Sequence, residues 1–250
     1  MGGVARRATL IRQQQQRSGT TLVLDVGNSL LYDRHPAKAT KGQSTIEAYN
    51  LMGYQAMTLG KLDLTYLTPD EIRQRMGEAH FPIISANAYI TGTQERIAQP
   101  YAILDVPNHK VGLVGLTEPL NNSNFYVTDP VEAAKSILPE VQRQADIIIL
   151  LSRAGQEANR RLAEEVKGID VILCGTNDVL DKPLVIESTG TVLLHADWTQ
   201  LGHAGERVGV GYLYFDKRGK LVHYEWWRVE LDNSYADDPT MRQWLEAKGW

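Results

Sequence analysis

The sequence predicts a single α/β domain in which two packed β-sheets are flanked by helices. Three observations lead to this prediction. Helices and strands alternate as far as residue 174, as they do in parallel βα units. The strand candidates at 146–151 and 169–174 are continuously apolar, which is typical of strands covered on both faces. Beyond Leu184 strand follows strand, which indicates antiparallel pairing.

The N-terminal elements follow from the spacing of apolar residues and from helix-starting signals. Residues 2–16 are predicted to be helical because Val4, Leu10 and Ile11 recur among Arg and Gln. A strand is expected next at 21–26. The same alternation then predicts a helix at 43–52, a strand at 56–59, a helix after Thr68-Pro69-Asp70 and a strand at 83–85.

The second half of the chain repeats this alternation before the pattern changes. It predicts helices at 131–144 and 156–166, strands at 146–151 and 169–174, four further strands at 184–187, 192–196, 208–215 and 221–231, and a last helix at 240–250. The turn Asp216-Lys217-Arg218-Gly219 joins the last two strands as a hairpin. With no linker and no internal repeat, residues 1–250 are predicted to form one domain.

Composition excludes several classes of function. The net charge of −4 offers no basic surface, so nucleic acid is not an expected partner. Cys174 is the only cysteine, which excludes an internal disulfide and a cysteine-rich zinc site. No stretch reaches the roughly 18 apolar residues of a membrane span, so no membrane insertion is expected. Without an apolar segment behind Arg6-Arg7, the sequence as written predicts a cytoplasmic protein, or an extracytoplasmic one if an N-terminal segment was removed.

Short motifs carry more specific information than the elements on which they lie. In chain order they are Gly2–Ile11, Leu22–Asn28, Asn50–Gly60, Phe81–Asn87, Val111–Thr117, Leu151–Gly155 and Gly168–Ile172. This collinear series resembles the catalytic domain of bacterial 5′-nucleotidases, within the calcineurin-like metallophosphoesterase superfamily. The resemblance implies a four-layer αββα sandwich of two mixed sheets, with the active site on loops at the strand ends.

The resemblance also implies where such enzymes hold two divalent metals, and this chain carries other residues there. Asn28 stands in place of the bridging Asp, so the negative charge between two cations is lost. Lys61, Leu62 and Asp63 replace the family's Asn-His-Glu, and Arg153 replaces a histidine of the Leu-Ser-His-x-Gly motif. The final Gly-Gly-His-x-His falls at Gly175, with Thr176 and Asp178 in the ligand region.

These replacements predict a pseudoenzyme, a non-catalytic binding or interaction module with no catalytic residue and no cofactor. The family's opening Asp-x-His strand and its C-terminal nucleotide-binding domain have no counterpart in residues 1–250.

The alternative is a metal-dependent phosphoesterase with a rebuilt or incomplete site. Asp178, His195, Asp197 and His203 would be its ligands, and a divalent metal such as Mn or Zn would be its cofactor. His195 and Asp197 alternate on a predicted strand and therefore face the same side.

Two kinds of partner remain open from the sequence. Asn28, Lys61 and Arg153 are candidates for binding a small anion such as phosphate, with two fixed cations in place of the metals; pairing with Asp63 and Asp178 is the simpler interpretation. Trp226 and Trp227 must face opposite sides of a strand, so one of them is exposed to a protein partner or a larger complex unless the C-terminal helix, with Trp244, covers it.

Overall fold

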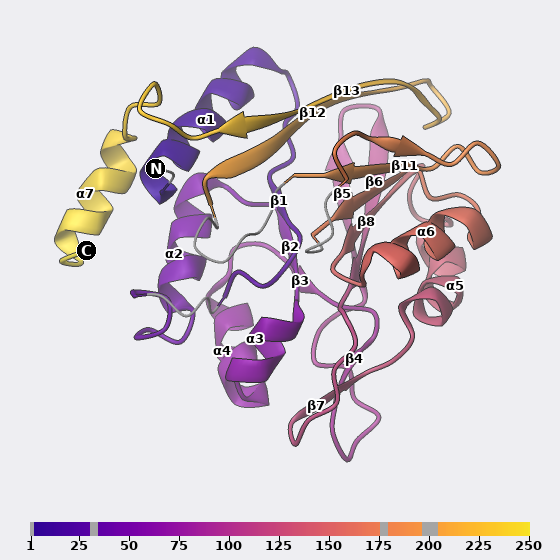
Figure 1. The fold of residues 1–250 in the computed structure, drawn as a ribbon, viewed down its shortest axis with the longest axis horizontal. Coiled ribbons are helices and arrows are strands. Elements are labelled where there is room, and N and C mark those ends of the chain that lie inside the picture. Colours follow the sequence, from indigo (N-terminus) through magenta and orange to yellow (C-terminus); the bar gives the residue numbers. More distant parts are fainter. Residues whose placement is uncertain (1–2, 31–34, 176–179, 197–204) are drawn as a thin grey trace.

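Two β-sheets lie face to face in the middle of the molecule, and helices cover the outer face of each (Figure 1). The structure is a computed structural model and describes residues 3–30, 35–175, 180–196 and 205–250. The four-layer αββα arrangement predicted from the sequence is thereby confirmed.

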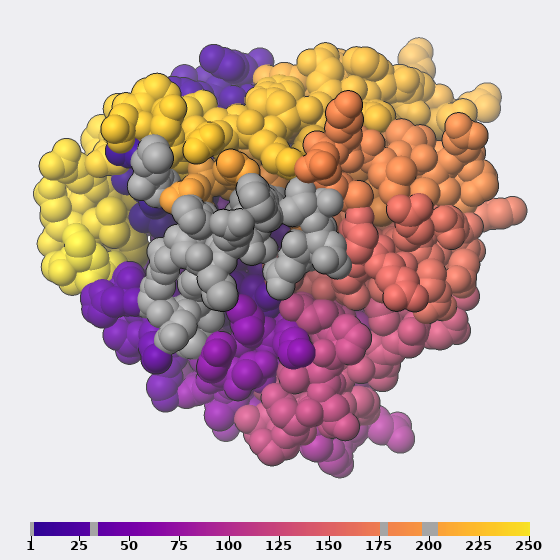
Figure 2. Space-filling view, in the orientation of Figure 1, coloured from indigo at the N-terminus to yellow at the C-terminus, as the bar shows by residue number. Residues whose placement is uncertain are grey.

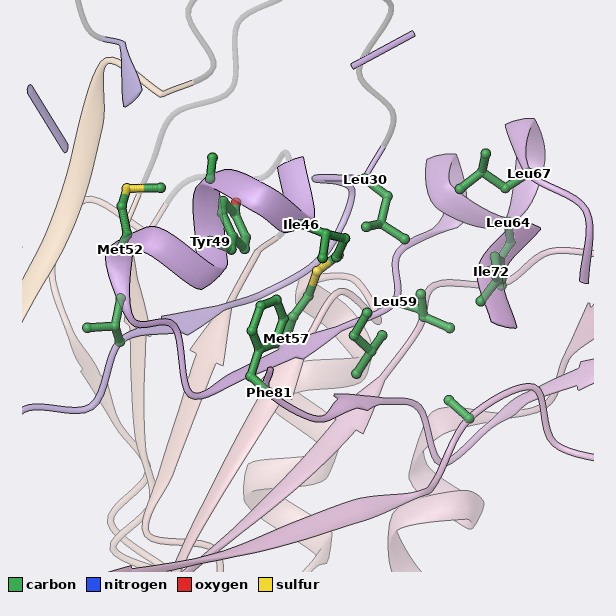
Figure 3. Packing of buried hydrophobic residues seen from close by; sticks show 14 of the residues in the cluster. Leu30, Ile46, Tyr49, Met52, Met57, Leu59, Leu64, Leu67, Ile72 and Phe81 are labelled. Carbon is green, nitrogen blue, oxygen red and sulfur yellow. The ribbon is translucent and has the colours of Figure 1, made fainter. Parts of the chain in front are cut away.

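The smaller sheet contains three parallel strands in the order β1 (Leu24–Asp25), β2 (Ala56–Thr58) and β3 (Ile83–Ile84). Its helices are α1 (Val4–Arg17), α2 (Gln43–Met52), α3 (Lys61–Tyr66) and α4 (Pro69–Glu78). Figure 3 shows part of the apolar cluster between these helices and the sheet, where Met57 and Leu59 meet Ile46 and Tyr49.

The larger sheet contains six strands in the order β10-β11-β9-β8-β6-β5. They are β5 (Tyr101–Val106), β6 (His109–Leu116), β8 (Ile147–Ser152), β9 (Val171–Cys174), β10 (Leu184–Val185) and β11 (Val192–His195). Helices α5 (Pro130–Val141) and α6 (Gln156–Glu165) cover its outer face. Two further strands, β4 (Ala88–Ile90) and β7 (Phe125–Val127), form a separate antiparallel pair.

Strand β8 explains why the sequence shows an unbroken apolar run. Ile147, Ile149 and Leu151 point toward the smaller sheet, whereas Ile148 and Leu150 point toward α5 and α6. Both faces of the strand are therefore in a core, and every one of its residues is buried.

The long hairpin of β12 (Arg207–Phe215) and β13 (Leu221–Glu230) forms its own two-stranded sheet. With α7 (Pro239–Ala247) it forms a continuous surface along the top and left of the view in Figure 2. Within the hairpin Trp226 packs into the core between the sheets, and its neighbour Trp227 lies on the opposite face against Tyr212 with 36% of its surface exposed.

Two sequence predictions about this region need correction. Strand β11 pairs with β9 in parallel, so the C-terminal part is not wholly antiparallel. Trp244 does not cover the tryptophans of β13, since its indole N–H donates to Glu47 at 3.2 Å and its ring meets Trp250. Among the described residues, no helix has the length and apolar character needed to cross a membrane.

Candidate functional site

The candidate site forms where β1, β2, β6 and β8 end and their following loops meet. The loop after β1 turns sharply at Gly27 and Asn28, whose φ angles of 91° and 63° both lie in the left-handed region. A Cβ atom on Gly60 would lie 2.1 Å from Asn28 Oδ1, so glycine is required for this approach. The two loops that carry the predicted site residues are therefore in direct contact.

Asp63 holds these two loops together from a fully buried position. Its carboxylate accepts three backbone N–H groups, from Asn28 at 3.0 Å, Leu30 at 2.9 Å and Gly60 at 2.8 Å. The bond from Gly60 also caps the start of α3. Burial raises the pKa of Asp63 to about 7, although the three N–H donors act in the opposite direction.

Both the oxygen and the nitrogen of the Asn28 side-chain amide form hydrogen bonds. Its Oδ1 accepts the Leu62 N–H at 2.8 Å, and its Nδ2 donates to Glu118 Oε1 at 3.2 Å. An amide engaged in this way fixes the loop after β1 to the start of α3 and to the loop after β6.

Arg153 follows β8 and brings a permanent positive charge into the same place. Its Nε lies 3.7 Å from Glu118 Oε2, and the two side chains are only 10% and 19% exposed. Glycines make room for the guanidinium stem, since a Cβ on Gly175 would lie 2.8 Å from Arg153 Cδ. Glu118 therefore balances the charge of Arg153 and also accepts from Asn28.

The structure thus brings Asn28, Asp63 and Arg153 together, and we call these three residues with Glu118 the Asp63 cluster. The charge of Arg153 is opposed by Glu118, whereas Asp63 accepts only backbone N–H groups in the hydrogen bonds described. The sequence analysis did not predict Glu118 as a site residue. The one feature that could have indicated it is its position two residues beyond β6, at the end of a central strand.

The remaining predicted residues are placed less centrally or not at all. Lys61 is exposed at the start of α3, and Leu62 contributes its backbone N–H to Asn28. His195 is buried at the end of β11, where its carbonyl accepts Arg228 Nε–H at 3.1 Å. The other four predicted positions, Thr176, Asp178, Asp197 and His203, lie outside the described residues.

The described side chains do not fit a pair of divalent metals. Within residues 3–30, 35–175, 180–196 and 205–250, no three His, Cys, Asp or Glu side chains gather as a metal site requires. The oxygen atoms of Asn28 and Asp63 are engaged with backbone N–H groups, and Arg153 places a cation beside them.

Comparison with known proteins identifies the family. The chain is 28% identical to the snake venom 5′-nucleotidase of Naja atra over 96% of its own length and 50% of the relative's. It is 27% identical to the 5′-nucleotidase of Bos taurus over 97% of its length and 46% of the relative's. A metallophosphoesterase of Bacillus subtilis, YunD, is 31% identical over 77% of this chain and 42% of that protein. The chain spans about half the length of these curated relatives.

Solved structures agree on the fold. A 5′-nucleotidase precursor from Thermus thermophilus superposes with a TM-score of 0.81 at 24% identity, over 98% of this chain and 52% of that one. The sulfate thiohydrolase SoxB, also from Thermus thermophilus, superposes with a TM-score of 0.86 at 19% identity, over 99% and 46% of the two chains. No protein-family model matches the chain.

These relatives overturn one expectation from the sequence, that the protein has no cofactor. That prediction is wrong, since 5′-nucleotidases and metallophosphoesterases typically work with divalent metals. The matches extend across nearly the whole chain, in sequence and in fold. The chain belongs to the 5′-nucleotidase group of the calcineurin-like metallophosphoesterase superfamily.

Proposed function

We propose that this chain is a non-catalytic member of the 5′-nucleotidase group that acts as a binding or interaction module. One observation carries the proposal. At positions where the resemblance places the metal-binding motifs, Asn28 and Asp63 are hydrogen-bonded to the chain's own backbone. We propose that the chain does not hydrolyse phosphoesters, and this proposal holds whether or not a metal binds.

The chemistry of the replaced residues supports this proposal. Phosphoester hydrolysis in this family needs cations that activate water and stabilise the phosphoryl oxygens. The Leu62 side chain offers neither a ligand atom nor a proton, and the Arg153 charge is already opposed by Glu118. The Asp63 cluster is accordingly suited to holding three loops in place.

The test is a hydrolysis assay on the purified chain, with AMP and p-nitrophenyl phosphate as substrates and Mn²⁺ added. We expect phosphate release at the rate of a protein-free blank for both substrates. The matched variants are Arg153→Met, which alters the cluster, and Arg143→Met, which changes an exposed arginine outside it. Turnover that is lost in R153M, retained in R143M and accompanied by native circular dichroism in both would contradict the proposal.

The alternative function is a metal-dependent phosphoesterase, and the names of the curated relatives favour it. It would draw on His195 together with Asp178, Asp197 and His203. Turnover that disappears in both Asp178→Asn and His195→Gln would establish this alternative in place of the non-catalytic module.

A further inference from the structure

The outer face of the β12–β13 hairpin changes in character along its length. At one end of this face Val208, Val210 and Val229 pack with Leu10 of α1. The turn end of the hairpin extends past α1 (Figure 1). There the same face continues with five residues from the two strands, Tyr212, Tyr214, His223, Glu225 and Trp227. We call these five residues the Glu225 patch.

The Glu225 patch is open to solvent. Tyr214 is 46% exposed, and the Glu225 side chain is 51% exposed. Valines occupy the part of the face that α1 covers, whereas aromatic rings and a carboxylate occupy the part that it leaves open. Large aromatic side chains that gather on an exposed face are typical of an interaction surface.

The register of the hairpin places Glu225 at the centre of the patch. Glu225 lies directly opposite Tyr212, and its neighbours on the same face of β13 are His223 and Trp227, each about 7 Å away along the strand. The Tyr214 hydroxyl donates to Glu225 Oε1 at 3.4 Å. The ring centroids of Tyr212 and Trp227 are 5.3 Å apart, and those of Tyr214 and His223 are 5.4 Å apart. Four rings therefore surround one carboxylate.

Within the described residues, Glu225 has no permanently charged partner. Its ion-pair contact there is with His223 Nε2 at 3.8 Å, and histidine is charged only when it is protonated. A carboxylate has about four acceptor positions, and the Tyr214 hydroxyl uses one of them. The patch thus combines an accessible negative charge with aromatic rings, and both attract a cation.

The chemistry of the patch fits arginine. A guanidinium group can stack on the faces of Trp and Tyr rings while it donates two hydrogen bonds to a carboxylate. One carboxylate supplies too few oxygen ligands for a divalent metal ion. Small molecules bind mainly in concave pockets, whereas His223, Glu225 and Trp227 lie outside the walls of the large cavity of about 1290 Å³. An open face with Trp and Tyr is better suited to the surface of another protein, where arginine is a frequent anchor.

We propose that the Glu225 patch is a docking site for an arginine side chain on the surface of another protein. The guanidinium group stacks on the rings of Tyr212 and Trp227 and donates to the Glu225 carboxylate. This inference rests on the proposed interaction role and names the chemistry of the partner. It uses no residue of the Asp63 cluster.

The probe is a short peptide of Gly and Ser with one central arginine, blocked at both ends and titrated into the ¹⁵N-labelled chain. We expect a saturable shift of the Trp227 indole N–H signal, which Trp227→Phe identifies by removing it, and of the Tyr212 and Glu225 backbone amides. A matched peptide carries citrulline, which keeps the shape of arginine but loses its charge. We expect the Kd of the citrulline peptide to be at least about tenfold higher.

Substitutions in the protein test each part of the patch. Glu225→Gln keeps the shape of the side chain but removes its charge, and it should weaken binding of the arginine peptide at least about fivefold. Glu187→Gln, at an exposed carboxylate outside the patch, should leave binding unchanged. Tyr214→Leu should weaken binding at least about twofold, whereas Tyr66→Leu, at an exposed tyrosine of α3, should not.

Four outcomes would overturn the proposal. The absence of any Trp227 shift would show that arginine does not bind to the patch. Equal Kd values for the arginine and citrulline peptides would show that the positive charge is not recognised, and equal values in E225Q and the wild-type chain would exclude the carboxylate. Trp227 shifts that follow protein concentration without peptide would assign the patch to a second copy of the chain. Because the titration does not measure phosphate release, its failure is distinguishable from a failure of the proposed lack of turnover.

Discussion

The Asp63 cluster and the edges of strands β1 and β12 line one cavity but differ in how their polar groups are satisfied. In the cluster, Asp63 accepts three backbone N–H groups and Asn28 uses both ends of its amide. Among the described residues β1 pairs only with β2 and β12 only with β13, so one edge of each strand has no strand partner. A buried polar group without a partner destabilises the fold unless something binds to it.

This difference teaches where to expect function in this chain. The cluster occupies the place that the family resemblance gives to catalysis, yet its side chains mainly hold loops together. The edges of β1 and β12 hold no such buried carboxylate. Substitutions in the cluster should therefore change the free energy of unfolding more than substitutions along these two edges.

The largest effect is expected from Asp63→Ala. It leaves three buried N–H groups without an acceptor and removes the cap of α3, so we expect the free energy of unfolding to fall by about 3–5 kcal/mol. Chemical denaturation measures this change. Asp105→Ala is the matched control, because the Asp105 side chain is 81% exposed, and it should change stability by no more than about 0.5 kcal/mol. A loss below about 1 kcal/mol in D63A would show that the carboxylate does not hold the loops.

The pH dependence of stability is expected to be the next largest effect. Burial raises the pKa of Asp63 from 3.8 to about 7, so the folded protein binds this proton more tightly than the unfolded chain. Between these two values unfolding releases the proton, and the free energy of unfolding should fall as pH rises, by at most about 4 kcal/mol.

Asp63→Asn is the control for this pH effect. It should reduce the slope without abolishing it, because burial also raises the pKa of Asp170 to about 6, which contributes in the same direction. Denaturant titrations at pH 4, 5, 6 and 7 provide the comparison. The same pH dependence in D63N as in the wild-type chain would contradict the burial argument.

A double-mutant cycle on Glu118 and Arg153 should show a smaller effect. Glu118→Gln leaves the guanidinium mostly buried without its counter-charge, and we expect a loss of about 1–3 kcal/mol. Adding Arg153→Met removes the unpaired charge and should restore part of that loss. Losses that simply add would mean that the two side chains do not interact.

The smallest effect concerns how tightly the hairpin is held in its layer. A Cβ on Gly209 would lie 2.3 Å from the Trp226 ring and 2.8 Å from the Ala196 side chain, so Gly209→Ala should cost about 1–2 kcal/mol. At Gly77 of α4 nothing lies within 4 Å, and Gly77→Ala should stabilise by about 0.5–1 kcal/mol. Thermal unfolding of the two variants gives the comparison, and equal shifts would show that the hairpin has room to move.

The local pattern of apolar residues in the sequence was sufficient to predict many of the helices and strands. The predicted helix at 43–52 coincides with α2, and the apolar run at 146–151 became β8, because periodicity and apolar continuity are properties of adjacent residues. The sequence analysis did not predict α3, β4, β5, β6 or β7. Most of these elements are short or only partly buried, and in the long, buried strand β6 the glycines Gly112 and Gly115 interrupt the apolar run. The parallel pairing of β11 with β9 was also missed, since the direction of pairing depends on distant strands.

The candidate site was predicted less completely. The family resemblance drew attention to Asn28, Lys61, Asp63 and Arg153, and the structure brings three of them into one cluster. Glu118 was missed because a single acidic residue after a strand has no pattern of its own. The cavity lined by β1 and β12 could not be foreseen either, since these strands lie about 180 residues apart in the sequence and come to line one cavity only in the folded chain.

A single experiment, amide hydrogen exchange on the wild-type chain alone, compares the hydrogen-bonded N–H groups of the Asp63 cluster with those at the unpaired edge of β1. We predict slow exchange at the Leu30 and Leu62 N–H groups, which donate to Asp63 and Asn28. We predict fast exchange at Leu24, because the Val23 carbonyl accepts the Gln55 N–H on the β2 side and the N–H of the next residue points away from β2. Leu24 exchanging as slowly as Leu30 would show that the edge of β1 is already paired. Fast exchange at Leu30 and Leu62 would show that Asp63 and Asn28 do not hold these N–H groups in stable hydrogen bonds. Either result would contradict the account.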